Sequence, residues 1–318
     1  MKNQKILFLS AIVLSFVLSF FQNEINAYYY QIIMYIGINI ILATSLNLIN
    51  GFAGQFSLGH AGFMALGAYT ASMVTTSLRV IPSDATSYAI FPIALILGGV
   101  VAAIAGLIVG IPSLRLKGDY LAITTLGFGE IIRVIIQNLN FVGGARGLTG
   151  IPKLSNFFWV FSVVAIVIFI ISNLINSTYG KGFLSVRDDE VAAQAMGINT
   201  TKYKVVAFVT GAFFAGMAGG LYAHFITYIT PSQFGFIKSI EIVVMVIVGG
   251  MGNTVGIVIA AILLTILPEA LRGVAEYRMV IYSLMLIVIM ISRPQGIFGK
   301  RLNIRKFFDK AKHSKAAA

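Results

Sequence analysis

Long apolar runs, separated by short polar segments, follow one another along almost the whole chain. Most of them approach the roughly 20 residues that a helix needs to cross a bilayer. They lie roughly at 6–21, 28–49, 56–78, 89–111, 119–138, 157–176, 205–228, 239–250, 254–268 and 279–292. Most are apolar on every side, which is typical of helices that face lipid or one another. The pattern predicts an all-α, polytopic membrane helix bundle with about 10 transmembrane segments (8–10).

The stretch 239–268 fits either one long span or two short ones. The glycine-rich segment 249–253 interrupts it, and such residues end or break a helix. Both ends of the chain are basic, with Lys2 and Lys5 at the start and a cluster of Lys and Arg in 300–318. Basic flanks favour the cytoplasmic side, so we expect both termini there and an even number of crossings. Splitting the stretch gives that even number, although a re-entrant hairpin would keep it too.

We interpret the chain as a single transmembrane domain, 1–318. It divides into a first span with its loop (1–27), spans two to six (28–176), a cytoplasmic loop (177–204), spans seven to ten (205–299) and a basic cytoplasmic tail (300–318). The N-terminal run follows two lysines, as in a signal peptide. It lacks a clear A-x-A cleavage site, and we therefore interpret it as a retained span.

Composition agrees with a membrane protein. Hydrophobic residues make up 58% of the chain and charged residues 11%, against about 45–50% and about 25% in soluble domains. The net charge is +12, and the Lys and Arg residues stand at the ends of apolar runs, as in the positive-inside pattern. This arrangement argues against nucleic acid as a partner. The absence of cysteine excludes disulfides, thiolate metal sites and cysteine nucleophiles.

The loop 177–204 contains a compact helix signature. Ser185 and Asp188 have the spacing of a capping box, and acidic residues follow where the helix dipole favours negative charge. Gly197 supplies a C-terminal stop. These signals predict one short helix over 186–196, roughly 16 Å long. Its small apolar face consists of Ala192, Ala195 and Met196.

Such a helix is too short and too charged to cross a membrane. Its apolar face suits insertion into a groove on a partner protein. An amphipathic connector lying on the bilayer surface fits the same spacing. The residues alone leave both interpretations open.

The same loop resembles a known family. Glu190, Ala192, Ala193 and Gly197 resemble the EAA-type loop of ABC importer permeases, and the wider segment 185–199 is similar to the version in LivM-type permeases of branched-chain amino-acid importers. Further segments agree in order: NLINGFAGQFSLGHAGFMALGAYTAS (47–72), LKGDYLAITTLGFGEIIR (116–133), GGARGLTGIP (143–152) and RPQGIFG (293–299). The resemblance covers about residues 28 to 299 and favours the LivM-like over the sister LivH-like permease.

The resemblance implies a coupling role for the loop, whose helix would dock on an ATPase subunit. The residues that it assigns to this loop are Arg187, Asp188, Asp189, Glu190, Ala192, Ala193, Met196 and Gly197. It further implies two ABC ATPase subunits, a LivH-like second permease subunit and an external substrate-binding protein as partners, with lipid around the spans. The implied location is a bacterial inner membrane, and the implied cargo is leucine, isoleucine and valine.

The chain has no G-x-x-x-x-G-K-[ST] motif, so we expect ATP and Mg²⁺ in partner subunits and no cofactor on this chain. Two alternatives remain open. Related permeases carry urea, amides or other amino acids. A secondary transporter coupled to H⁺ or Na⁺ would need a buried carboxylate, for which Glu130 is the candidate, and Arg133 would neutralise it. Paired catalytic carboxylates and a Ser/His/Asp arrangement are not found, and we expect no enzyme activity.

Polar positions inside the spans are candidates for the substrate path. One group lies in the glycine-rich segment 47–72: Asn47, Gly54, Gln55, Ser57 and His60. Small residues there favour close helix packing, although a broken helix beside a cavity would also fit. His60 has no second ligand at suitable spacing, so we expect it to be neutral and hydrogen-bonded, and we expect no metal site.

Glu130 and Thr149 complete the candidate path. Glu130 and Arg133 stand three apart, and we expect them to pair within one helix, with a gate element as the functional alternative. Thr149 belongs to a turn-rich external loop, 143–152, where Arg146 departs from the small polar or acidic residue expected in relatives. Glu241 is expected at the external interface, and Glu269 at a helix end.

Overall fold

The computed structural model describes residues 24–271 except 83, 114, 115 and 117, together with scattered positions between 8 and 19 and between 277 and 297. The spans predicted at 6–21 and 279–292 fall partly outside the described residues, and the basic tail at 300–318 falls wholly outside them. Over the described part the chain is helical, and its extended pairing is limited to one isolated bridge between Leu148 and Ile229.

The helices follow one another with short connections. They are α2 Ala27–Asn47, α3 His60–Ser77, α4 Ala85–Ser113, α5 Asp119–Asn138, α6 Phe157–Asn176, α7 Thr178–Asp188, α8 Glu190–Ala195, α9 Thr200–Ile226, α10 Phe236–Gly249 and α11 Thr254–Ala270. Shorter turns are the π-helix η1 Leu48–Phe52 and the 3-10 helices η2 Asn140–Val142, η3 Gly144–Arg146 and η4 Pro231–Phe234. Within this part the predicted spans agree to within a few residues, and those at 119–138 and 157–176 have the observed bounds.

Five helical stretches of the described chain are long and apolar enough to cross a membrane: Ala27–Phe52, Thr86–Pro112, Phe157–Asn176, Thr200–Ile226 and Pro231–Gly249. The shorter Thr254–Ala270 is apolar as well. An all-α membrane bundle is therefore confirmed, whereas the number of about ten crossings stays a prediction.

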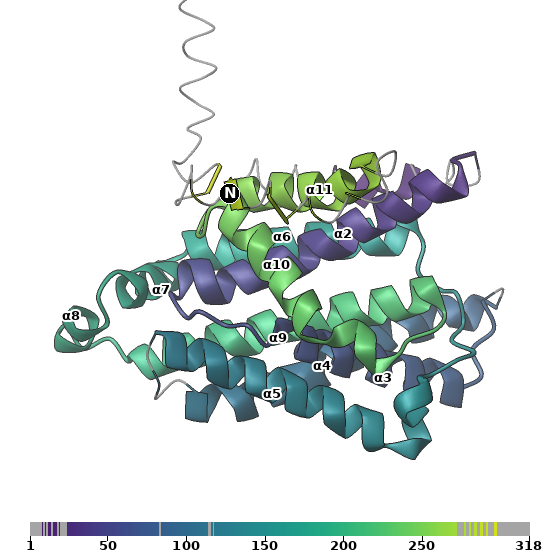
Figure 1. Cartoon of the computed structure of the whole chain (residues 1–318), viewed down its shortest axis with the longest axis horizontal. Coiled ribbons are helices and arrows are strands. Elements are labelled where there is room, and N and C mark those ends of the chain that lie inside the picture. The colour runs from purple at the N-terminus through teal and green to yellow at the C-terminus, as the bar shows by residue number, and fades with distance from the viewer. Residues whose placement is uncertain are drawn as a thin grey trace, which may run out of the picture.

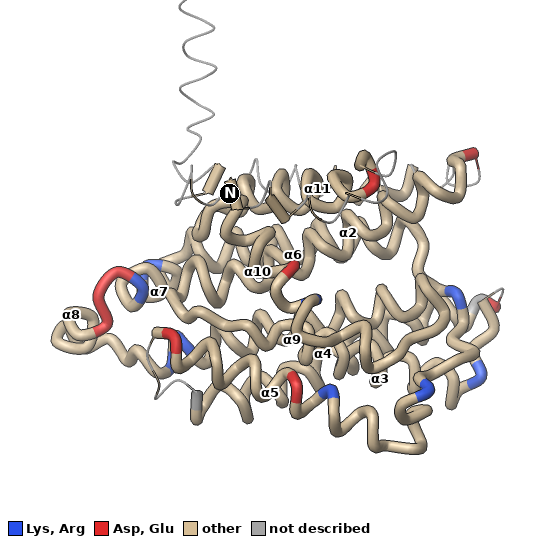
Figure 2. The backbone as a smooth tube through the Cα atoms, viewed as in Figure 1, with Lys and Arg blue, Asp and Glu red and all other residues tan. Residues whose placement is uncertain are grey.

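The helices form two layers (Figure 1). α2, α6 and α11 lie along one side, and α3, α4, α5 and α9 lie along the other, while α10 crosses between them. The segment α7–α8 projects from one end of the bundle, which we call the α8 end. Figure 2 shows that charged residues gather at the α8 end and at the opposite end, with few between. This distribution is what a bilayer around the middle of the bundle requires.

Glycines set the close approach of α3 to its neighbours. A side chain on Gly67 would overlap the backbone of Gly216 in α9, and one on Gly59 would overlap the backbone of Thr125 in α5. Gly62 similarly faces the backbone of α5. Small residues at such contacts let transmembrane helices pack tightly, so the structure supports the packing interpretation for the glycines after position 58.

The stretch 239–268 is two helices. α10 ends at Gly249, and α11 begins at Thr254 after a turn in which Gly250 and Gly252 take positive φ angles of 92° and 81°. Only glycine adopts such angles without strain. The Asn253 side chain then caps α11 by accepting a hydrogen bond from the Gly256 N–H. The predicted split at 249–253 is confirmed.

The single helix predicted over 186–196 is wrong. Asp189 is extended, and its carboxylate accepts the N–H groups of Val191 and Ala192, so it ends α7 and caps α8. Ser185 does not cap a helix, because its hydroxyl donates to the Lys181 carbonyl inside α7. An acidic side chain that can cap satisfies free N–H groups wherever the chain turns, and here the cap is Asp189, the second of three consecutive acidic residues.

The predicted stop at Gly197 is confirmed. Its φ is 81°, its N–H donates to the Gln194 carbonyl, and the Ile198 N–H reaches back to the Ala193 carbonyl. This pair of bonds closes the end of α8 in the manner of a Schellman motif.

Candidate transport pathway and coupling segment

α7 and α8 form the segment for which the family resemblance predicts a coupling role, and we call it the coupling segment. Its tip presents an apolar surface. Val191 is 67% exposed and Met196 is 82% exposed, and Ala192 and Ala195 are exposed beside them. Ala193 is buried and belongs to the opposite side. A short projecting helix with an exposed apolar face is suited to a groove on a partner.

The acidic residues of this segment bind within the chain. Glu190 accepts a hydrogen bond from Lys204 at 2.6 Å, and the Lys204 side chain is only 3% exposed. Thr200 accepts from the Gln194 amide at 2.9 Å. These contacts attach α8 to the start of α9. Glu190 therefore anchors the segment, which the sequence pattern could not show because Lys204 is 14 residues away.

Aromatic side chains attach α7 to the same helix. Tyr179 and Phe183 pack against Tyr203, with ring centroids 4.6 Å and 5.4 Å away respectively. A side chain on Gly182 would overlap the Tyr203 ring. Burial raises the pKa of the Tyr179 phenol, and the neighbouring Tyr203 raises it further. These aromatic contacts attach the coupling segment to α9 as one unit.

Arg187, at the end of α7, reaches two turns in the body of the bundle. Its guanidinium pairs with Asp188 at 2.7 Å and donates to the Gly51 carbonyl at 3.4 Å. A side chain on Gly252 would lie 3.2 Å from the same guanidinium. Asn47 joins the two turns, because its side-chain oxygen accepts the Gly252 N–H at 2.8 Å. The coupling segment therefore contacts both η1 and the turn between α10 and α11.

The other polar candidates in 47–60 lie in the interior, whereas Gly54 is exposed. His60 contacts the Ser45 hydroxyl at 2.8 Å, which confirms that it is hydrogen-bonded. The Ser57 N–H donates to the Asn50 side chain. Gln55 is 8% exposed, and its amide donates to a nearby carbonyl. Gly54 has a positive φ of 67° and lies against Arg187. These contacts favour packing, and a role in the substrate path stays a prediction.

Glu130 and Arg133 pair at 2.6 Å on α5, as predicted. Their side chains are 32% and 28% exposed, and both lie near Gly235 at the start of α10. The pair thus packs beside the junction of η4 and α10. Its role as a gate stays a prediction.

Thr149 lies beside a cavity at the end opposite α8. The cavity is about 1000 Å³, and its lining includes Gln137, Arg146 and Tyr228. The Tyr228 hydroxyl donates to the Arg146 carbonyl at 2.8 Å, which joins the loop 143–152 to the loop after α9.

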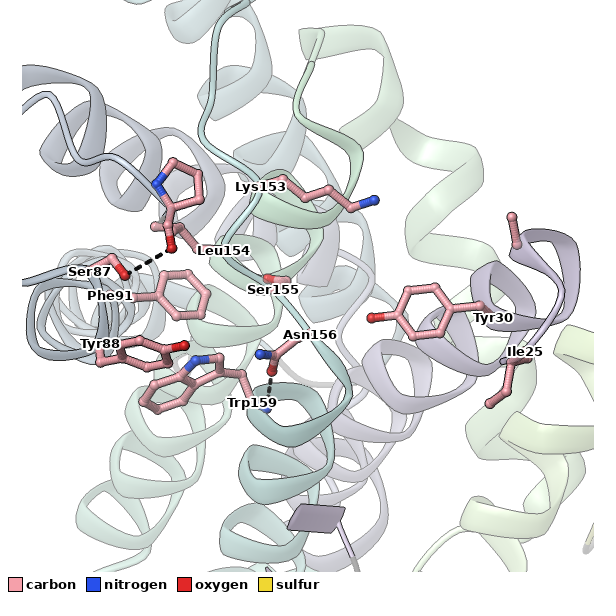
Figure 3. Close-up of a pocket in the computed structure, with 12 residues that line it drawn as sticks. Ile25, Tyr30, Ser87, Tyr88, Phe91, Lys153, Leu154, Ser155, Asn156 and Trp159 are labelled. Carbon is pink, nitrogen blue, oxygen red and sulfur yellow. Dashed lines mark hydrogen bonds between the residues drawn. The ribbon is translucent and has the colours of Figure 1, made fainter. Parts of the chain in front are cut away.

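A second cavity, of about 440 Å³, lies between the starts of α2, α4 and α6 (Figure 3). Phe91, Tyr88 and Trp159 gather on one side of it, and Tyr30 points in from the other. Lys153 lies at the top of this view, and its side chain extends toward the side of Tyr30. Aromatic side chains therefore line much of this cavity, and Lys153 gives its described lining a positive charge.

A third cavity, of about 330 Å³, lies among α2, α3, α9, α10 and α11. Lys238, Glu241 and Glu269 line it; the sequence pattern predicted Glu241 at the external interface and Glu269 at a helix end. The sequence did contain a signal for an ion pair at this place, since Lys238 and Glu241 have the same spacing as Glu130 and Arg133. The sequence did not show that α11 and α2 lie opposite this pair, across the cavity.

Comparisons with known proteins agree with this architecture. The family described as "Branched-chain amino acid transport system / permease component" matches residues 28–290. The high-affinity branched-chain amino acid transport system permease protein LivM of Salmonella typhimurium is 35% identical in an alignment of 295 residues, and the match covers 82% of this chain and 67% of that protein. The LivM protein of Escherichia coli is 34% identical with the same coverage.

The sister permease protein LivH of Salmonella typhimurium is 24% identical over 82% of this chain and 91% of its own length. No solved structure matches the chain. Since the family match covers well over half of the chain, and LivM proteins match most of it at more than 30% identity, the chain belongs to the permease components of branched-chain amino acid transport systems.

Proposed function

We propose that this chain is the transmembrane permease subunit of an ATP-driven ABC importer that carries leucine, isoleucine and valine across a bacterial inner membrane. The names of the LivM relatives support the cargo. The missing phosphate-binding motif supports a separate energy source. The chain is a transporter membrane subunit and not an ATPase.

The observation that carries this proposal is the projecting α7–α8 segment. It exposes an apolar face at its tip, and through Arg187 it contacts the turns at Gly51 and Gly252. A partner that closes on ATP binding would move this tip, and the contacts would pass the movement to η1 and to the α10–α11 hairpin. Such a device needs two arrangements of the bundle, each favoured by one state of the partner.

The complete importer in this proposal contains two ATPase subunits, a second LivH-like permease and an external substrate-binding protein. The α8 end faces the cytoplasm, as do both termini. Exposed apolar residues along α4, such as Ile93, Ile104 and Ile108, face lipid or the second permease.

Replacing an exposed apolar residue of α8 tests the docking. Val191→Asp should leave the chain inserted but abolish its copurification with the ATPase subunits, and leucine uptake should be lost as well, because a charge enters a desolvated groove. Phe141→Asp is the matched control, since Phe141 is 69% exposed at the opposite end. Normal copurification of the Val191 variant would refute docking through α8.

Dependence on ATP tests the energy source. Leucine uptake in vesicles should stop when the ATPase subunits carry an inactive phosphate-binding lysine. Uptake that continues, driven by an ion gradient, would refute the importer and establish a secondary transporter instead.

A further inference from the structure

The cavity beside α10 differs from the other two in its chemistry. It occupies about 330 Å³ and is bordered by five helices from both layers, at the place where α10 crosses between them (Figure 1). Pockets for small molecules in proteins are about 300–1,000 Å³. The cavity is therefore large enough for one amino acid.

One wall of this cavity carries opposite charges. The Lys238 ammonium donates to the Glu241 carboxylate at 3.1 Å, and their side chains are 22% and 44% exposed. Glu269, on the facing helix α11, accepts a hydrogen bond from the Tyr28 hydroxyl at 2.7 Å. Charges within a membrane bundle are costly and are kept mainly for function. The wall thus offers one ammonium group and two carboxylates.

Much of the remaining wall is apolar and adaptable, and Tyr35 and Tyr222 also line the cavity. Ile38, Met64, Met245 and Leu264 line it, and each is at most 4% exposed. Methionine side chains adjust to ligands of different shape. Asn39 donates to Thr265 at 2.9 Å across the same space, so these polar atoms satisfy each other. An aliphatic side chain of variable branching suits such a surface.

We infer that this cavity is a transient binding site for the translocated amino acid, in which Glu241 pairs with the substrate ammonium, Lys238 with its carboxylate, and the apolar wall with its aliphatic side chain. The inference rests on the proposed function. A zwitterion exchanges the Lys238–Glu241 ion pair for two ion pairs, so neither of these two charges is left unpaired. The competing Lys238–Glu241 contact keeps binding weak, as a site on a translocation path requires.

The other cavities lack this match. Along its described lining, the cavity of Figure 3 carries Lys153 as its charged residue, and the cavity at Thr149 carries Arg146. Either could pair with a carboxylate, but neither offers a partner for an ammonium group. A solute without charges, such as urea or a sugar, would leave the Lys238–Glu241 pair closed.

Cysteine protection tests the site directly, because the chain has no cysteine of its own. Thr265→Cys is introduced into the reconstituted importer, and labelling of this chain by a small methanethiosulfonate is followed by mass spectrometry. Leucine at several times its half-protecting concentration should slow labelling about fivefold. Lys153→Cys, in the cavity of Figure 3, should label at an unchanged rate. Met245→Cys replaces Thr265→Cys if the latter variant does not transport.

Charge variants and truncated ligands define the chemistry. In the Thr265→Cys background, Glu241→Gln should raise the half-protecting leucine concentration about tenfold, the effect of losing one charge-assisted contact. Isopentylamine, which lacks the carboxylate, 4-methylpentanoate, which lacks the ammonium group, and urea should not protect.

The outcomes separate the two proposals. An importer that takes up leucine but shows no protection at Thr265→Cys and Met245→Cys would overturn this inference and leave the proposed function standing. Equal slowing at Lys153→Cys would also overturn it, because the effect would then be a general conformational change. An importer that does not take up leucine would refute the proposed function itself.

Discussion

Two lysine–glutamate pairs in this chain have the same chemistry and opposite surroundings. Glu190 and Lys204 join α8 to α9 across 14 positions, with the lysine almost fully buried. Lys238 and Glu241 stand one turn apart on α10 and border a cavity from which both can be reached. The first pair has an almost fully buried lysine and holds two elements together. The second can exchange its partner for a ligand, so burial and connectivity decide the role of a pair.

The largest expected effect comes from breaking the anchoring pair. Glu190→Gln leaves the buried Lys204 ammonium without its carboxylate, which should lower the free energy of local unfolding of α8 by about 3 kcal/mol. Hydrogen exchange of the amides in 190–196 should become faster by about two powers of ten. Lys204→Gln should cost less, about 1–2 kcal/mol, because the Glu190 side chain is 25% exposed and can be solvated. Equal effects of the two variants would contradict the assignment of an anchor.

At the cavity we expect a smaller effect on stability, together with a loss of leucine uptake. Lys238→Gln should change stability by less than about 1 kcal/mol, since partly exposed pairs one turn apart contribute little. Leucine uptake by the importer should nevertheless fall about tenfold, because the substrate carboxylate loses its partner. Thermal unfolding and uptake are measured on the same preparation. A loss of stability that accounts for the loss of uptake would place this pair in the same class as Glu190–Lys204.

The smallest effect is expected at the Glu130–Arg133 pair. It has the same spacing in sequence as Lys238 and Glu241 but does not line their cavity. Glu130→Gln removes one member of the 2.6 Å pair on α5, whose side chains are about as exposed as those of Lys238 and Glu241. Leucine uptake should stay within about twofold of the unmodified importer, and stability should change by less than about 1 kcal/mol. A loss of uptake as large as that of Lys238→Gln would instead support a gate at Glu130.

Helix positions could be predicted well and side-chain partners poorly. The bounds of α5 and α6, the break at 249–253 and the stop at Gly197 follow from residues next to one another in the chain. The continuous helix over 186–196 was a local prediction too, and it was wrong because several acidic residues in succession could each have served as the cap. Local signals locate an element well but do not choose between neighbouring caps.

The sequence by itself determined the membrane character, the order of the helices and the family, because a spanning segment must be apolar and must satisfy its own backbone hydrogen bonds wherever it lies. Only the tertiary structure decided that Glu190 meets Lys204, that Arg187 reaches the turns at Gly51 and Gly252, and that Lys238 and Glu241 face α11 across a cavity. Those contacts depend on which helices become neighbours. Small residues and matching surfaces along several helices set that choice together, and no single segment of the chain contains it.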